Sequence, residues 1–497
     1  MKTILICITL ICSNILFSQT QGIAYTAVGK GVATTFLTDY HCLGINTSAL
    51  GWGTGFEKKK FTLGSSEFGF GITSDILSEQ RLKTFSKALY TAIAGDPSSK
   101  ILNWKEQQTA ISEFALAGVT VQGDYNWGGF SFQDKFFGGI AFNVRENYQW
   151  YSKLSNNATD LIINGKVSNL FDSLDIKIGN ITTRIPNSDH LSTDSLNAVV
   201  NGTMAIPLPL STLLHGSSIK MVWNRSYNLG YGRKVFGIDN FVEVYAGIGG
   251  RIIKSMAMFD LDATGNGIEL YSSLSSIFNI NYQNVASSVN TLKNYTSGIP
   301  PSVGSGYGID LSGSAIFWKK LKVAIAINNI GSVTYDRNVY RVKDTLIGSI
   351  GINSLTDFNV TKSVNQLLTK GGLLKLEGQE KYHLTNAATF RLGGSFHHKN
   401  ILGIGFDLVA PFNSDNPGNI KNTVISFGGD LRIVKWLQLS CGYFGGGIYK
   451  NNMPVGVNFI LRDGGYEFGF SSRDALSFFQ KDGHSLSFAM GFARVRF

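Results

Sequence analysis

Charged residues, proline and cysteine are all scarce in this sequence of 497 residues. Asp, Glu, Lys and Arg make up 16% of the chain, whereas about 25% is usual for soluble domains. The 4 cysteines cannot form a disulfide framework for so long a chain, and proline contributes 9 residues. Glycine, in contrast, contributes 57 residues and the aromatic residues 12%. This composition favours one large barrel whose strands face lipid over several soluble domains.

Long apolar runs are missing as well, except at the N-terminus. The segment "MKTILICITLICSNILFSQ" has one lysine, then an unbroken apolar stretch, then a more polar end. Such a segment is typical of a secretory signal peptide and is too short for a membrane-spanning helix. We therefore predict a signal peptide at residues 1–18, with cleavage near Ser18 or Gln19. Lipidation of Cys12 is the alternative, but the three residues before it are not the small ones that usually precede a lipoprotein cysteine.

Alternating apolar and polar residues fill the C-terminal half of the chain. In the segment 305–318 one face is formed by Tyr307, Ile309, Leu311, Ala315 and Phe317. Nine segments from residue 305 onward follow this two-residue period, which is the pattern of β-strands. Short connections such as Lys319-Lys320 alternate with long ones such as 330–385. This alternation is typical of an outer-membrane barrel and argues against a soluble sandwich, whose two apolar faces would meet inside.

The sequence thus predicts an all-β fold, a transmembrane antiparallel barrel formed by residues 61–497. Closure leaves no unpaired edge in lipid and favours an even strand count, so we expect about 14 strands, within a range of 12–16. In the N-terminal half we expect strands near 61–71, 117–132, 136–151, 218–230, 235–250, 252–262 and 268–280. Helix signals predict short helices, in the lumen or on loops, near 75–94, 104–117 and 358–370.

The last strand ends on Phe497. A terminal aromatic residue resembles the signal that the outer-membrane assembly machinery reads, which predicts an outer-membrane location. A periplasmic C-terminus would make the short turns periplasmic and the long loops extracellular. This strand alternates less regularly than the others, because Phe488 and Phe492 share their parity with Arg494 and Arg496.

Charges of both signs fall on the polar faces of the strands, at Asp310, Lys322, Arg391, Asp407, Asp430, Arg432 and Glu467. Because an unpaired buried charge is costly, these groups must be paired or hydrated. We favour structural ion pairs in the barrel wall. The alternative is a polar conduit, but balanced charges would select neither anions nor cations.

Three segments qualify as candidate chemical sites, and each has a simpler interpretation. The segment "DLDATGNGIE", 260–269, carries oxygen ligands around glycines, but its glutamate comes too early for a calcium loop, which favours a turn. His397-His398 lacks further metal ligands nearby. His41-Cys42 has neither a hydrolase elbow nor a phosphate loop to support catalysis. We therefore expect no catalytic residue, metal or cofactor.

Nucleic acid is not an expected partner. The net charge is +10, yet the chain has no dense block of Lys and Arg with interleaved aromatic residues. The partners that we expect are the lipid of the outer membrane and the assembly machinery during insertion. A protein of a secretion or assembly complex is a possible further partner.

The segment between the signal peptide and the first strand, residues 19–60, lacks both strand and helix periodicity. Its sequence "AVGKGVATTFLTDYHCLGINTSALGWG" resembles the start of the long-chain fatty acid transporter (FadL) family and its PorV-like relatives. The matching residues are Gly29, Gly31, Ala33, Asp39, Asn46, Ala49 and Leu50. Thr47 and Ser48 stand where the family often has proline. Other segments, such as "NYQWYSKL" and "WNRSYNLGYGRKVFG", are similar to a Bacteroidota group of outer-membrane barrels with no assigned function.

The resemblance implies a 14-stranded barrel whose lumen holds residues 19–60 as a hatch, with the matching residues inside it. A disordered N-terminal tail is the alternative. Passive uptake of a hydrophobic or amphipathic small molecule is the function that we favour. A partner barrel of a protein secretion or outer-membrane assembly complex is the alternative, and an enzyme is the third choice, because fold alone does not fix function.

Overall fold

Fourteen antiparallel strands close into one barrel in the computed structural model. The structure describes residues 24–56, 59–77, 112–113, 115–188, 191–264, 267–278, 280, 299–350, 375–399, 401–418, 422–446, 449–475 and 484–497. Each strand pairs with its neighbour, and β1 closes the barrel by pairing with β23 from Thr62↔Arg496 to Thr73↔Ser485. This closure confirms the predicted barrel of about 14 strands.

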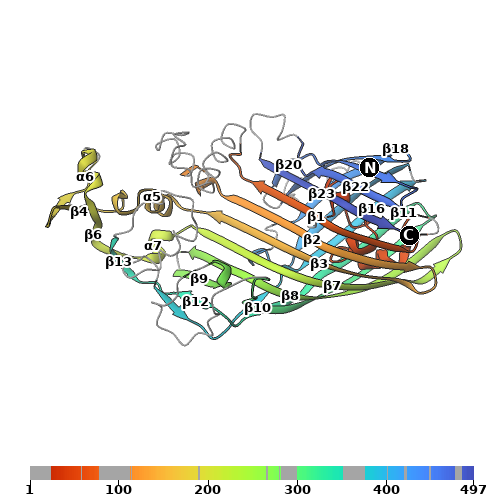
Figure 1. Cartoon of the computed structure of the whole chain (residues 1–497), viewed down its shortest axis with the longest axis horizontal. Coiled ribbons are helices and arrows are strands. Elements are labelled where there is room, and N and C mark those ends of the chain that lie inside the picture. The colour runs from red at the N-terminus through yellow and green to blue at the C-terminus, as the bar shows by residue number, and fades with distance from the viewer. Residues whose placement is uncertain are drawn as a thin grey trace, which may run out of the picture.

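The first five strands of the wall are β1 (Phe61–Thr73), β2 (Val119–Asp134), β3 (Gly138–Lys153), β7 (Ser218–Ile238) and β8 (Val242–Thr264). The other nine are β10 (Gly304–Phe317), β11 (Leu321–Tyr335), β16 (Thr389–His398), β17 (Leu402–Pro411), β18 (Val424–Val434), β19 (Leu437–Gly446), β21 (Val455–Leu461), β22 (Tyr466–Ser472) and β23 (Ser485–Arg496). All the connections at one end of the barrel are short, namely 135–137, 239–241, 318–320, 399–401, 435–436 and 462–465. The C-terminus lies at this short-turn end (Figure 1).

Three of the predicted strands in the N-terminal half differ from the structure. The predicted strands 235–250 and 252–262 are largely one strand, β8, and the turn before it lies at 239–241, where Asn240 has a φ of 58°. Gly232 and Arg233, which resemble a turn in the sequence, instead pair with β8. The predicted strand 268–280 is β9 (Gly267–Leu274), which pairs with β8 outside the closed wall.

The wall has its apolar face outside and its polar face inside, the reverse of a soluble protein. On β17 and β18, Ile404 and Phe427 are 52% and 57% exposed, whereas the inward Asp407 is fully buried. Exposed aromatic rings also gather at the short-turn end, at Phe136, Phe241, Trp318, Trp436 and Phe497. An apolar belt with an aromatic girdle is the surface of a transmembrane barrel. Among the described residues, no helix is both long and apolar enough to cross a membrane.

Bulges explain the irregular last strand. Inward residues of β23 run from Ser485 to Gly491 at every second position, but further along Arg494 and Arg496 face inward. The same change of parity occurs on β1 beside Ser66, whose φ is 57°, and on β2 between Asn126 and Gly128, where the register shifts. An extra residue in a strand reverses the faces that follow it. The two arginines therefore enter the lumen while the phenylalanines stay outside.

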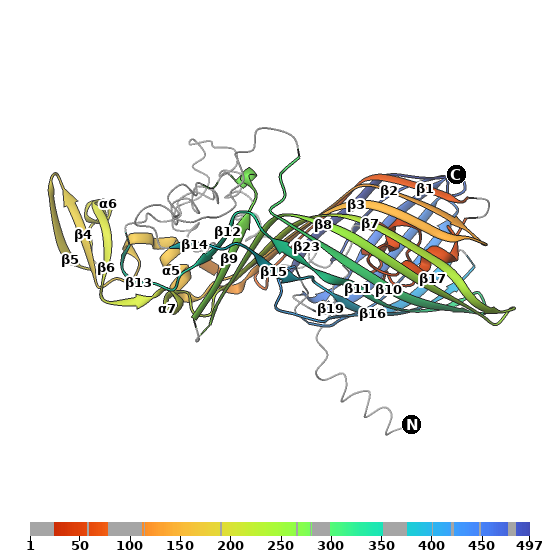
Figure 2. The ribbon, with the colours of Figure 1, turned by 90° about the horizontal axis from the view of Figure 1, so that it is seen from below.

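A second sheet projects beyond the long-loop end, where the sequence analysis expected only long loops (Figures 1 and 2). Its order is β13 (Leu346–Ile350), β6 (Val199–Pro209), β4 (Ser173–Ile178) and β5 (Ile181–Pro186). The helices α5 (Asn156–Asn164), η3 (Gly165–Val167), α6 (Thr193–Asn197) and α7 (Leu210–Leu214) accompany it. A separate apolar core includes Leu174, Val199, Leu210 and Leu270.

Short elements complete the long-loop end. They are β9, η4 (Ser276–Phe278), β12 (Val339–Val342), β14 (Leu376–Gly378), β15 (Tyr382–Thr385) and β20 (Tyr449–Asn452). The predicted helix 358–370 lies outside the described residues, as does 75–94 after residue 77. Of the predicted helix 104–117, residues 112–113 and 115–117 are described and helical. The signal peptide also lies outside the described residues.

Residues 24–56 fold inside the lumen, in the half near the short turns (Figure 2). This segment, the hatch, contains α2 (Tyr25–Val28), η1 (Asp39–Cys42) and η2 (Thr47–Trp52). Its own apolar residues, among them Leu37, Cys42, Ile45 and Leu50, are buried together. These residues form a folded plug, so the alternative of a disordered tail is wrong for them.

Candidate functional site: the hatch and the vestibule above it

A buried hydrogen-bond cluster fixes the hatch to the first strands. Oε1 of Glu67 on β1 accepts a hydrogen bond from the Tyr40 hydroxyl at 2.7 Å and lies 2.8 Å from Nε2 of His41. Its Oε2 accepts from Nδ2 of Asn126 at 2.9 Å. Asn143 on β3 donates to the carbonyl of Tyr40 at 3.1 Å. A buried carboxylate with this many donors ties η1 to three neighbouring strands.

Asp39 joins the hatch to the last strand. Its carboxylate forms an ion pair with Arg494 and accepts a hydrogen bond from the backbone N–H of His41 at 3.1 Å. Asp39 has a φ of 55°, a conformation that residues other than glycine rarely adopt. Glu467 on β22 pairs with both Arg494 and Arg496. These contacts bring together ends of the chain that are 455 residues apart.

The other matching residues also lie inside the hatch or against the wall. Asn46 donates to the carbonyl of Thr34 at 2.8 Å and accepts from the Ser48 hydroxyl at 2.6 Å. A side chain on Gly29 would collide with the backbone of Gly456, since its Cβ would lie 2.5 Å from that Cα. Buried positions are also occupied by Gly31, Ala33, Ala49 and Leu50. All seven residues thus lie in the folded segment 24–56.

Two further contacts that hold the hatch were not predicted from the sequence. Lys30 forms an ion pair with Asp430, and Asp407 binds the backbone of the hatch. Asp407 and Asp430 were assigned to the polar faces of strands, but nothing in the sequence pairs them with residues some 400 positions away. Arg494 and Arg496 of β23 were visible in the sequence as an irregularity, because they fall at the same alternate positions as the phenylalanines of that strand.

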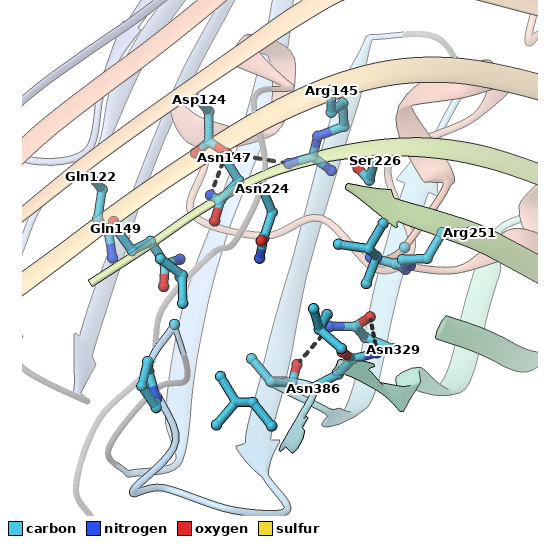
Figure 3. Close-up of a pocket in the computed structure, with 18 of the residues that line it drawn as sticks. Gln122, Asp124, Arg145, Asn147, Gln149, Asn224, Ser226, Arg251, Asn329 and Asn386 are labelled. Atoms are coloured by element: carbon cyan, nitrogen blue, oxygen red, sulfur yellow. Dashed lines mark hydrogen bonds and ion pairs between the residues drawn. The ribbon is translucent and has the colours of Figure 1, made fainter. Parts of the chain in front are cut away.

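A polar cavity, the vestibule, lies on the long-loop side of the hatch. Its volume is about 130 Å³, and Gly44 of the hatch lines it. The polar wall includes Gln122, Asp124, Arg145, Asn147, Gln149 and Asn224 (Figure 3). Asp124 accepts from Asn147 at 2.9 Å and lies 3.5 Å from Arg145. Arg251, Asn329, Asn386 and Arg473 also line it, together with the aliphatic side chains of Val222, Ile253, Val333 and Leu384.

The loop 412–418 covers the vestibule. It leaves β17 and crosses to the opposite wall, where a Cβ on Gly418 would lie 2.8 Å from Val222 on β7. The Lys220 ammonium donates to the carbonyl of Asp415, and Asn416 donates to the carbonyl of Thr385 at 2.8 Å. Pro417 and Gly418 therefore form a roof over the cavity, with the hatch as its floor.

The other candidate chemical sites are engaged in structural contacts. Asp260 and Asp262 both pair with Lys220, at 3.3 and 2.5 Å, and both lie within the strand β8. His397 lies 2.8 Å from the Ser395 hydroxyl and packs its ring on Phe36 of the hatch. Among the described residues, no three His, Cys, Asp or Glu side chains gather as metal ligands do.

The fold and its contents define a class: a transmembrane β-barrel with a folded plug in its lumen and a covered vestibule above the plug. No family model matches the sequence, and no curated protein matches it either. Three solved structures that resemble it are the toluene transporter TbuX of Ralstonia pickettii, a FadL homologue of Pseudomonas aeruginosa and the CymD monoaromatic hydrocarbon channel. Each is 10% identical, with TM-scores of 0.41, 0.37 and 0.40. They cover 96%, 97% and 96% of this chain, and 98%, 98% and 96% of their own.

Proposed function

We propose that the protein is an outer-membrane barrel that admits a small amphipathic or hydrophobic molecule by passive uptake. The observation that carries this proposal is the mixed lining of the vestibule. Amide and charged groups line it together with the aliphatic side chains of Val222, Ile253, Val333 and Leu384. A binding site of this kind takes an apolar body and orients it through a few polar contacts.

The position of the vestibule supports the same function. It lies inside the barrel, between a roof formed by the loop 412–418 and a floor formed by the hatch. A solute held there is therefore part of the way through the lumen. Ion pairs and hydrogen bonds hold the loop and the hatch against the wall of the barrel. Such contacts allow a plug to move without unfolding the barrel.

The outer membrane is the location that the surface supports. A closed barrel with an apolar belt and an aromatic girdle suits that membrane. Phe497 contributes to the girdle, stacks on Phe61 with ring centroids 5.5 Å apart, and completes the pairing of the barrel seam through its backbone. Its role as the signal for the assembly machinery is part of this proposal.

Uptake of matched solutes tests the function. Cells that carry the chain should take up radiolabelled octanoate or octylamine several-fold faster than cells without it, while a disaccharide enters both at one rate. Val333→Asn replaces an aliphatic side chain of the lining with an amide and should reduce uptake of the amphipathic solute. Thr182→Asn on the exposed strand β5 is the matched control. Entry of both amphipathic solutes at the background rate, with the barrel folded, would overturn the proposal.

A further inference from the structure

Asp407 holds the first third of the hatch by a single carboxylate oxygen. Its Oδ2 accepts hydrogen bonds from the backbone N–H of Ala33 at 2.7 Å and of Thr34 at 2.9 Å. Asp407 is fully buried on β17, and its other oxygen, Oδ1, has no hydrogen-bond partner. A charged acceptor for two amides is a strong anchor, but half of its bonding capacity is unused.

Arg391, on the neighbouring strand β16, is a buried cation without a hydrogen-bond partner. Its side chain is fully buried, and none of its three guanidinium nitrogens has a hydrogen-bond partner. Gly393 pairs with Asp407 and Arg391 with Val409, so Arg391 and Asp407 are diagonal neighbours on one inward face. Side chains as long as arginine reach across this diagonal. A buried guanidinium that lacks partners is costly, and a bidentate pair with a carboxylate is its best relief.

We propose that Asp407 is a latch with two partners, the hatch amides in the closed state and Arg391 in the open state. This inference rests on the proposed function, since it describes how the hatch would give way. When Asp407 turns to Arg391, the hatch loses two hydrogen bonds to its backbone and the wall gains an ion pair between neighbouring strands. The bonds lost to the hatch are thus offset by the ion pair gained in the wall, which is what a two-state switch needs.

The remaining contacts limit the movement to the segment around residues 33–35. Residues 39–41 are tied to Glu67 and Arg494 by the buried cluster, which leaves η1 in place. Near Asp407, in contrast, the hydroxyls of Thr35 and Ser426 are buried without hydrogen-bond partners. The part of the seam around residues 33–35 is therefore polar but weakly bonded, whereas residue 30 of the hatch is held to β18 by the ion pair of Lys30 with Asp430. When the latch opens, a solute therefore passes between the hatch and the strands β16–β18.

Thiol labelling of the chain without residues 1–18, which contain Cys7 and Cys12, tests the latch in lipid vesicles. The first reporter is Thr34→Cys with Cys42→Ser and Cys441→Ser, and the second is the native Cys42 with Cys441→Ser. A small methanethiosulfonate reagent should label the cysteine at position 34 about tenfold faster after Asp407→Asn, because a charge-assisted anchor is weakened. Arg391→Met should slow the same labelling below the parent rate, since Asp407 then has no second partner. Cys42 should stay protected in both variants.

Lys322→Met is the matched control for Arg391→Met. Lys322 is also an inward cation of this wall, but it packs on the Trp52 ring, away from Asp407, so labelling at position 34 should stay at the parent rate. Opposite effects of Asp407→Asn and Arg391→Met support the latch, because two merely structural residues would change labelling in one direction. Changes in the same direction, or labelling of Cys42 together with position 34, would overturn it.

Octanoate and octylamine uptake, measured on the same variants, separates the two proposals. If labelling follows the latch while no variant takes up either solute, the latch stands and the uptake function fails. If the parent takes up a solute while the two latch variants label at the parent rate, the latch is overturned and the uptake function stands.

Discussion

Tyr40 and Glu67 form a hydrogen bond between the hatch and the first strand of the barrel, with the phenol oxygen 2.7 Å from Oε1. Both side chains are almost completely buried, and the Tyr40 ring packs against Gly64 and Gly129, where any side chain would collide with it. The hatch is therefore seated by shape as well as by charge. Glycines in the wall provide the recess, and a carboxylate at its edge provides the bond.

Removal of the two partners of this bond should have unequal effects on stability. Tyr40→Phe deletes one donor and leaves Glu67 with His41 and Asn126, so the free energy of unfolding should fall by about 1 kcal/mol. Glu67→Ala leaves Arg494 and His41 with less negative charge nearby, so the free energy of unfolding should fall by about 3–5 kcal/mol. Urea unfolding in lipid vesicles, followed by tryptophan fluorescence, measures both. Equal losses of stability in the two variants would contradict the conclusion that Glu67 is the residue on which the cluster depends.

Close contact between the hatch and the wall predicts a strong effect of one glycine. A Cβ on Gly428 would lie 1.8 Å from the carbonyl oxygen of Lys30, so Gly428→Ala should displace the hatch and make the barrel leak. We expect a stability loss of about 1–3 kcal/mol from the overpacking. Influx of a small sugar into vesicles measures the leak. Gly313→Ala is the matched control, since its nearest neighbouring atom would be 3.8 Å away, and a leak from both variants would contradict the explanation.

The sequence predicted the wall better than the lumen, for a physical reason. Lipid on one side and polar groups on the other impose a two-residue period, and the nine strands from residue 305 onward follow it. Arg494 and Arg496 break this period because a bulge turns them inward, and the sequence shows the break but not its partner. The partners of Asp39 and Asp407 have no local signal, since they are set by how distant segments meet in three dimensions. The projecting sheet was missed because strands in water outside the barrel have no lipid-facing period to mark them.

Release of the loop over the vestibule should raise uptake. Lys220 holds this loop through the carbonyl of Asp415 and also pairs with Asp260 and Asp262. Lys220→Met removes the donor while keeping the aliphatic part of the side chain, so solute should enter the vestibule more freely. Initial uptake of octylamine should rise several-fold if entry limits the rate. Lys177→Met, an exposed lysine of β4, is the control, and unchanged or lower uptake with Lys220→Met would argue against a roof.

Deletion of residues 24–53 should turn the plugged barrel into an open one. A barrel of this size has a lumen too wide for its wall side chains to fill, so the hatch, and not the wall, blocks small solutes. The barrel itself should still assemble, because the strand pairing and the pairs of Glu467 with Arg494 and Arg496 lie within the wall. Vesicles with the shortened chain should swell in isosmotic sugar, whereas vesicles with the full chain should not. Equal permeability of two folded barrels would show that another part of the chain, such as the loop 412–418, closes the lumen.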